Sequence, residues 1–134
     1  MTTLADTVAE RGRLTFTPWD TATVAFDADS DDALFLLVPV LGPSASVLLH
    51  HVSRRLRHQP ELDIGAADLA HACGLGHNPT RNGLLVRSLT RLEHFGYLRH
   101  HSSGRCEIRT KIPPLSHRHI AQLPEYLQVL AVID

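Results

Sequence analysis

The stretch that decides the fold runs from Asp63 to Arg109 and reads DIGAADLAHACGLGHNPTRNGLLVRSLTRLEHFGYLRHHSSGRCEIR. Residues 66–73 contain four alanines and one leucine, as expected of a short helix. The Gly-Leu-Gly of residues 74–76 ends it with a turn, because glycine adopts positive φ without strain. A longer basic helix is predicted to follow over about residues 80–95. Residues 97–110 then alternate in polarity around a Ser-Ser-Gly turn, which predicts a β-hairpin.

The basic helix is predicted to have one buried side and one open side. Leu85, Leu89 and Leu92 recur at three- and four-residue steps and form an apolar stripe. Arg87 and Arg91 lie on the opposite side of the same helix. A helix, a turn, a second helix and a hairpin in this order resemble a winged helix-turn-helix, a module that usually lays its second helix in a DNA major groove. We therefore expect the arginine side to stay open to solvent.

A supporting helix is expected immediately upstream, over about residues 45–58. Its apolar residues recur at helical spacing: Ala45, Leu48, Leu49, Val52 and Leu56. The break at Pro60 ends the helix, and a small strand around Ile64 is expected before the next one. Residues 44–111 are therefore predicted to form one domain, with the supporting helix packed under the other two.

Residues 1–43 are expected to form an acidic N-terminal extension. Residues 13–26 combine aromatic side chains with threonines, which predicts one or two short strands. The apolar run Leu34–Leu41 is interpreted as a buried strand or an extended arm, which brings an apolar surface to the domain or to a partner subunit. The Gly-Pro pair that follows the run ends it.

Residues 112–134 are expected to form a C-terminal helical tail for packing or dimerisation. Four apolar residues in it have the spacing of a helix-packing seam: Ile120, Leu123, Leu127 and Leu130. Pro124 is predicted to split the tail into two helical pieces. We expect a homodimer, joined through the tail, through the apolar N-terminal run, or through both.

The whole chain is predicted to be an α+β protein, mainly α-helical with a small β-hairpin. Its 134 residues, 43% hydrophobic and 20% charged, are ordinary for one globular domain. The first residues lack the pattern of a secretory signal, and the longest apolar run is too short to cross a bilayer. The chain has only two cysteines, which suggests a reducing compartment and not a disulfide framework. We therefore expect a cytoplasmic protein without membrane association.

Charge is distributed unevenly along the chain. Residues 1–43 contain two arginines and seven acidic residues, whereas residues 44–111 contain ten basic and five acidic residues. Residues 112–134 contain one arginine and two acidic residues. This pattern is typical of a nucleic-acid-binding module that carries an acidic segment, although charges that merely solvate different faces would give the same count.

Three segments resemble the bacterial winged helix-turn-helix transcriptional regulators: LAHACGL at residues 69–75, VRSLTRLE at residues 86–93 and FGYL at residues 95–98. In that superfamily a Leu-Ala helix and a Gly-Leu turn precede the recognition helix, and a Gly-aromatic pair leads into the wing. The resemblance spans residues 45–111 and implies duplex DNA as partner and transcriptional regulation as function. The connection before the recognition helix is longer than is usual there, by residues 77–81.

The candidate DNA-contacting residues lie on the recognition helix, just before it, and on the hairpin. Arginine reads guanine edges or holds phosphates, and asparagine reads adenine. Arginines of the hairpin would reach the minor groove or the flanking phosphates, although an ordinary solvated surface would look the same. The full set is Thr80, Arg81, Asn82, Arg87, Ser88, Arg91, Arg99, Ser103 and Arg105.

Catalytic and metal sites are not expected. The sequence contains no Gly-rich phosphate loop, nucleophile elbow or evident carboxylate pair, so we expect neither an enzyme nor a cofactor. Adjacent histidines on a helix do not face one site, and the two cysteines lack metal-ligand spacing. The pair to check for a metal is His100 with Cys106, across the hairpin.

Two alternatives to an open DNA-binding surface follow from the same residues. The domain would be a protein-interaction module without DNA contact, which docks a partner through Leu34–Leu41 or through the C-terminal tail. Alternatively, the acidic segment would lie over the basic face and inhibit it. In that case deleting residues 1–32 is predicted to raise the affinity for DNA.

Overall fold

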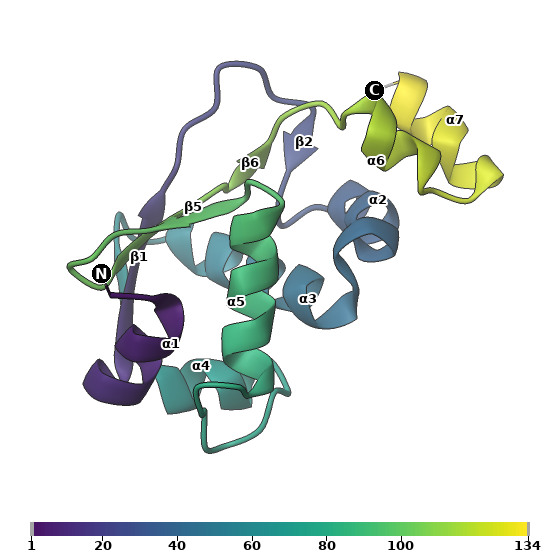
Figure 1. The fold of residues 1–134 in the computed structure, drawn as a ribbon. Helices are drawn as coiled ribbons and strands as arrows, with labels where there is room; N and C mark the ends of the chain where they lie inside the picture. Colours follow the sequence, from purple (N-terminus) through teal and green to yellow (C-terminus); the bar gives the residue numbers. More distant parts are fainter. Residues whose placement is uncertain (1, 134) are drawn as a thin grey trace.

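The computed structural model describes residues 2–133 as helices packed around a small mixed sheet (Figure 1), which confirms the α+β expectation. In chain order the elements are α1 (Leu4–Asp6), the π-helical turn η1 (Thr7–Arg11), β1 (Arg13–Pro18), β2 (Phe26–Asp27), α2 (Asp31–Leu41), α3 (Pro43–Leu56), β3 (Leu62–Gly65), α4 (Ala66–Ala72), α5 (Leu84–His94), β4 (Leu98–His100), β5 (Arg105–Ile108), β6 (Lys111–Ile112), α6 (His117–Ala121) and α7 (Glu125–Ile133). Met1 and Asp134, the outer ends of the predicted N- and C-terminal segments, lie outside the described residues.

The main sheet has the strand order β3-β1-β5-β4, so β1 is an interior strand. It pairs antiparallel with β3 and parallel with β5, with Phe16 opposite Leu62 on one side and Cys106 on the other. β2 and β6 form a separate two-stranded sheet. The short strands expected in residues 13–26 are therefore present, and one of them lies at the centre of the main sheet.

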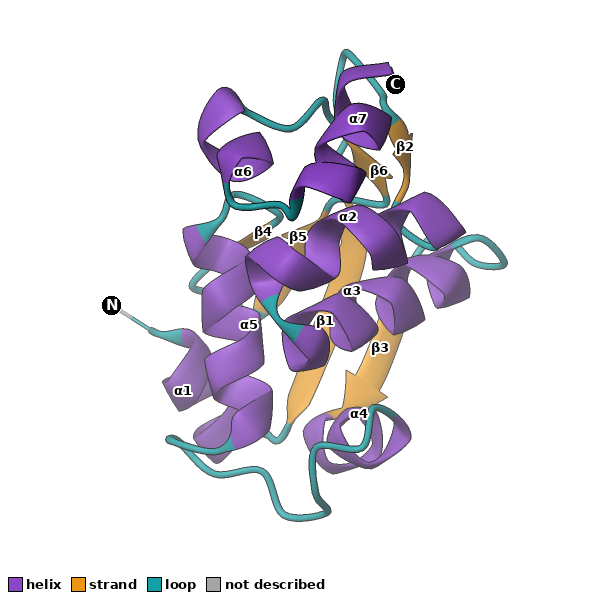
Figure 2. Cartoon of the chain, turned by 90° about the vertical axis from the view of Figure 1, so that its right-hand side faces the viewer, coloured by secondary structure: helices purple, strands orange, loops and turns teal. Residues whose placement is uncertain are grey.

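The two faces of the main sheet differ in chemistry because side chains alternate along each strand. Leu14 and Phe16 of β1, with Cys106 and Ile108 of β5, point inward and are fully buried. α3 lies across this inner face (Figure 2). The outer face carries polar and charged side chains, among them those of Arg99, Arg105 and Glu107 at alternate positions of β4 and β5.

The run Leu34–Leu41 is helical, so the expectation of a strand or an extended arm is wrong. It belongs to α2, which is capped by the Ser30 hydroxyl accepting a hydrogen bond from the Ala33 N–H over 3.2 Å. Pro39 is tolerated because it is exposed, and the carbonyl left without a partner, that of Phe35, lies in an exposed residue. Five residues of α2 are buried in the core: Ala33, Leu36, Leu37, Val40 and Leu41.

The recognition helix expected over residues 80–95 is α5, and it begins later than predicted, at Leu84. Residues 80–83 form a turn that ends at Gly83, which has extended backbone and no side chain to cap the helix. The inward stripe Leu85, Leu89 and Leu92 is buried as expected. Three of the candidate residues, Thr80, Arg81 and Asn82, therefore precede the helix.

The hairpin and the C-terminal tail follow the predicted order. β4 and β5 are joined by a turn in which Gly104 has φ +87°, a conformation that favours glycine. Pro124 separates α6 from α7, and Leu123 and Leu127 of the expected seam are buried against the chain itself. Among residues 2–133, no helix combines the length and the apolar character needed to span a bilayer.

Candidate nucleic-acid interface

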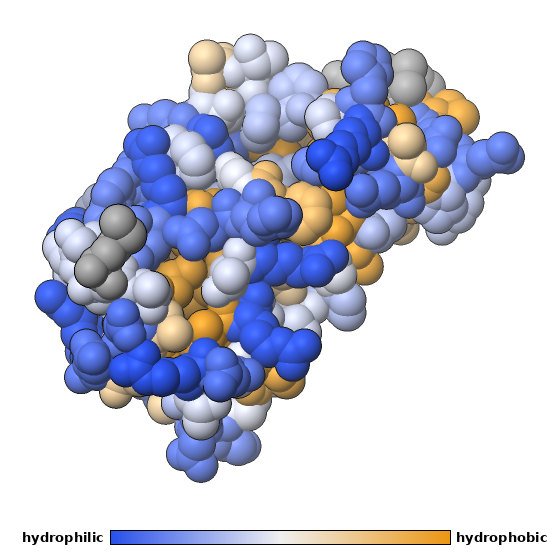
Figure 3. Space-filling view, viewed as in Figure 1, coloured by the Kyte–Doolittle hydropathy of each residue, from blue (hydrophilic) through white to orange (hydrophobic). Residues whose placement is uncertain are grey.

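α5 is held by its apolar stripe and leaves its opposite side at the surface. It contacts α3 on one flank and α1 on the other. Hydrophilic side chains cover its outer side, with hydrophobic patches beside it (Figure 3). Arg87 and Arg91 are both exposed there. The arginine side of the helix is therefore open, as its sequence pattern predicts.

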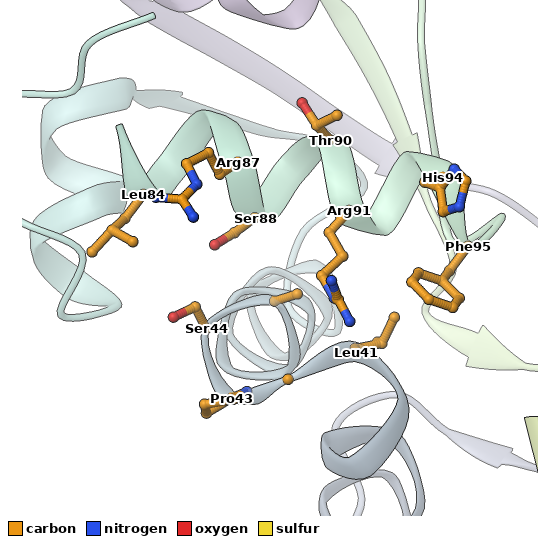
Figure 4. Close-up of a pocket in the computed structure, with 12 residues that line it drawn as sticks. Leu41, Pro43, Ser44, Leu84, Arg87, Ser88, Thr90, Arg91, His94 and Phe95 are labelled. Atoms are coloured by element: carbon orange, nitrogen blue, oxygen red, sulfur yellow. The ribbon is translucent and has the colours of Figure 1, made fainter. Parts of the chain in front are cut away.

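A hollow of about 510 Å³ lies between α5 and the junction of α2 with α3. Figure 4 shows Arg91 and Phe95 pointing from α5 toward this junction, whereas Thr90 points away from it. Ser88 points toward Ser44 and is only 5% exposed. Of the candidate residues, this hollow brings together Arg87, Ser88 and Arg91, and Ser88 forms part of its wall.

Arg91 is fixed over the hollow by two contacts. Its guanidinium donates a hydrogen bond of 3.2 Å to the carbonyl oxygen of Val40, and it lies 5.3 Å from the centre of the Phe95 ring. Val40 is in the last turn of α2, where carbonyls have no partner within the helix. Arg91 therefore caps α2 while its side chain stays exposed.

A second hollow, of about 410 Å³, adjoins the first at the C-terminal end of α5. It is lined by His94 and Phe95 together with Arg118, His119 and Gln122 of the α6 region. The rings of Phe95 and His119 lie 5.4 Å apart. Sequence reasoning missed this part of the surface because α6 is remote in the chain, and only the His-Arg-His run at residues 117–119 signals it.

The two hollows share His94 and Phe95 and form one strip along α5 and α6. Among the described residues that line either hollow, none is acidic. Within residues 2–133, Arg87, Arg91 and Arg118 form no ion pair with a carboxylate. We call this surface, made of Arg87, Arg91, His94, Phe95, Arg118, His119 and Gln122, the basic strip.

Arg81 lies outside the basic strip and is neutralised by the N-terminal segment. It forms ion pairs with Asp6 of α1 and with Glu10 of η1, the latter at 3.4 Å. The hydrogen bond from Arg81, with one from the Thr3 backbone N–H, lowers the pKa of Asp6 to about 2. The acidic segment therefore contacts Arg81, whereas no acidic residue among those described lines the basic strip.

The hairpin arginines lie on the outer face of the sheet, away from α5. Arg99 makes a two-pronged ion pair with Glu107, at 2.8 and 3.1 Å, and its guanidinium lies 4.5 Å from the Trp19 ring centre. Arg105 pairs with Glu61 at 2.6 Å. Both arginines lie on the outer face because side chains alternate along a strand, and the neighbouring residues of β4 and β5 point inward. The structure does not bring them together with Arg87 and Arg91.

The remaining candidates, Thr80, Asn82 and Ser103, are exposed on loops. Ser103 lies in the hairpin turn, and the N-terminal segment separates that turn from α5. A hollow of about 690 Å³ is lined by residues 2–5, by Thr90 and Glu93 of α5, and by residues 100–102. The segment is attached to the hairpin by a hydrogen bond of 2.8 Å between Thr7 Oγ1 and His100 Nε2.

His100 and Cys106 are direct neighbours across the hairpin, as expected. Cys106 is fully buried, and burial raises the pKa of its thiol to about 12. Burial likewise lowers the pKa of His100. Within residues 2–133, no three histidine, cysteine or acidic side chains lie close enough together to hold a metal ion.

Comparison with known proteins adds no relative. No family model, no curated protein and no solved structure matches the chain.

Proposed function

We propose that this protein binds duplex DNA through α5 and acts as a transcriptional regulator. In this proposal α3, α4 and α5 with the β4–β5 hairpin form a winged helix-turn-helix unit, and α5 is its recognition helix. The observation that carries the proposal is the basic strip, an arginine- and histidine-lined surface along α5 and α6. Its guanidinium groups have no carboxylate partner among the described residues.

The dimensions and the chemistry of α5 support this role. Its 11 residues give a rod about 16 Å long, and the major groove, about 12 Å wide, admits an α-helix. Arg87 is exposed one turn into the helix, where residues of a recognition helix reach base edges. A guanidinium group without an internal partner binds a phosphate or a guanine edge without first losing an ion pair.

The hairpin has a smaller part in this proposal than the sequence predicts. Arg99 and Arg105 would each have to exchange a carboxylate for a phosphate, and they lie on the far face of the sheet. Exposed pairs of this kind contribute only about 0–1 kcal/mol, so the exchange is not prohibitive. Location is the stronger argument, because one straight duplex on α5 does not face the outer side of the sheet.

A salt titration tests the proposal. The full chain is titrated into a labelled random-sequence duplex at several salt concentrations, because affinity for phosphates falls linearly with salt on logarithmic scales. We expect binding at low salt, a steep salt dependence, and an affinity lower by about 1–3 kcal/mol in Arg87→Ala. Arg55→Ala, which removes an exposed arginine of α3 outside the basic strip, is the control. Binding that is absent at low salt would refute the proposal.

A protein-docking role without DNA contact is the second candidate. It is favoured by a patch of exposed apolar side chains on α2 and α3, with Leu34 at 42%, Phe35 at 57% and Val47 at 42% exposed. The patch adjoins a hollow of about 350 Å³ lined also by His50 and Arg54. A fully folded protein that binds no duplex at low salt would support this role instead.

A further inference from the structure

We propose that the junction of α5 and α6 is a phosphate-binding site, which holds a backbone phosphodiester of the DNA beside the groove that α5 enters. This inference rests on the proposed function and deepens it. The sequence predicts that the hairpin contacts the flanking DNA backbone. The present inference assigns this contact to the C-terminal helices instead. The residues that would take the phosphate are His94, Arg118, His119 and Gln122.

The site offers hydrogen-bond donors and positive charge without a competing acid. Arg118 is exposed and provides a guanidinium fork, the side chain whose geometry matches phosphate oxygens best. The Gln122 amide adds neutral donors, and each imidazole ring adds at least one. The hollow of about 410 Å³ has room for a phosphate group, and none of its described lining residues is acidic.

One aromatic ring arranges the donors around the hollow. Phe95 is half-buried and contacts His94 edge-on at 5.4 Å between ring centres, and the centre of the His119 ring also lies 5.4 Å from that of Phe95. The guanidinium of Arg91 lies 5.3 Å from the same ring, so the phosphate site and the α5 hollow share a wall. A duplex in contact with Arg91 would therefore have its backbone close to α6.

Packing against the core holds α6 in this position, and the charge of Arg118 is not needed for it. The Ser116 hydroxyl accepts a hydrogen bond of 3.2 Å from the His119 N–H and begins the helix. Leu123, between α6 and α7, and Leu127 of α7 are buried, and α7 contacts α2. Arg118 can consequently be changed without removing a contact that the fold needs.

The experiment compares Arg118→Gln and Arg118→Lys with the parent chain in the salt titration described above. Loss of one phosphate contact is expected to weaken binding about tenfold at low salt, to the same extent for every DNA sequence. It is also expected to reduce the salt slope by about 0.9. Arg118→Lys retains the charge and should keep the parental slope, while Arg55→Gln removes a charge elsewhere and serves as the matched control.

Each outcome decides a separate claim. If the parent chain binds no duplex, the proposed function fails. If Arg87→Ala weakens binding but Arg118→Gln changes neither affinity nor slope, the backbone contact at the α5–α6 junction is refuted and the proposed function stands. A second arm adds inorganic phosphate and follows the Gln122 side-chain amide by NMR. A phosphate-induced shift together with unchanged DNA binding in Arg118→Gln would assign the site to a free phosphate and overturn the backbone contact.

Discussion

The guanidinium of Arg91 donates a hydrogen bond of 3.2 Å to the carbonyl oxygen of Val40. The contact ties the outer side of α5 to the last turn of α2, so the same side chain serves the fold and faces the proposed DNA. Arg87, one turn earlier, makes no such bond within the described residues. The two arginines have the same role in the sequence-based prediction, but in the structure only Arg91 is expected to contribute to stability.

Replacing Arg91 by alanine is expected to lower both stability and DNA affinity. The variant loses the bond to Val40 and the contact with the Phe95 ring, which together should lower the free energy of unfolding by about 1–2 kcal/mol. Arg87→Ala is expected to change it by less than about 0.5 kcal/mol. Urea unfolding of both variants measures the difference, and equal stability of the two would contradict the capping role of Arg91.

Asp6→Asn is expected to raise the affinity for duplex DNA at low salt. The substitution removes a negative charge beside α5 and releases Arg81 from its main partner. Fluorescence anisotropy with a labelled duplex measures the effect, and Asp63→Asn, which releases Arg13 on the outer face of the sheet, is the control. An affinity that rises equally in both variants would indicate a general charge effect and no masking of Arg81.

Deleting residues 1–32 is not a clean test of the same masking, although the sequence suggests it. The deletion would remove β1, the interior strand that joins β3 to β5. We expect Phe16→Ala alone to cost about 3–5 kcal/mol of stability, because the ring is fully buried on the inner face of the sheet. Thermal or urea unfolding checks this value, and a loss below about 1 kcal/mol would contradict the place given to the Phe16 ring in the core.

The ion pair on the hairpin makes stability depend on pH. The hydrogen bond from Arg99, with one from His101, lowers the pKa of Glu107 from 4.5 to about 2. A carboxyl group whose pKa is lowered by folding stabilises the fold above its unfolded pKa, and this contribution is lost as the pH falls from 4.5 to about 2. In Arg99→Gln the contribution above pH 4.5 should be smaller, whereas Arg87→Gln should keep the parental profile. Urea midpoints between pH 2 and 6 measure it, and identical profiles would contradict the pairing.

Periodicity predicted the elements that depend on local sequence. The stripe Leu85, Leu89 and Leu92 identified the buried side of α5, and Pro124 marked the break between the C-terminal helices. The helical nature of α2 was predictable as well, since Ser30 and the two aspartates after it form a helix start. The run through Leu34–Leu41 obscures this helix start because it is almost continuously apolar and contains a proline.

Contacts between distant parts of the chain could not be predicted. The sequence of β1 does not indicate that it pairs with β3 and β5, because strand pairing depends on tertiary contacts between distant segments. The partner of Arg81 is 75 residues away, at Asp6, so the sequence does not show that this arginine is neutralised. For the same reason the sequence does not indicate that Arg118, on the C-terminal tail, lies near α5.

The central claim is that α5 and α6, and not the outer face of the sheet, meet the DNA. The most direct measurement is a two-dimensional amide NMR titration of the full chain with a short duplex at low salt. The account predicts shifts concentrated in residues 84–95 and 116–122, with little change in residues 13–17 and 105–107. Shifts confined to the hairpin and the outer sheet face, or no shifts at all, would contradict it.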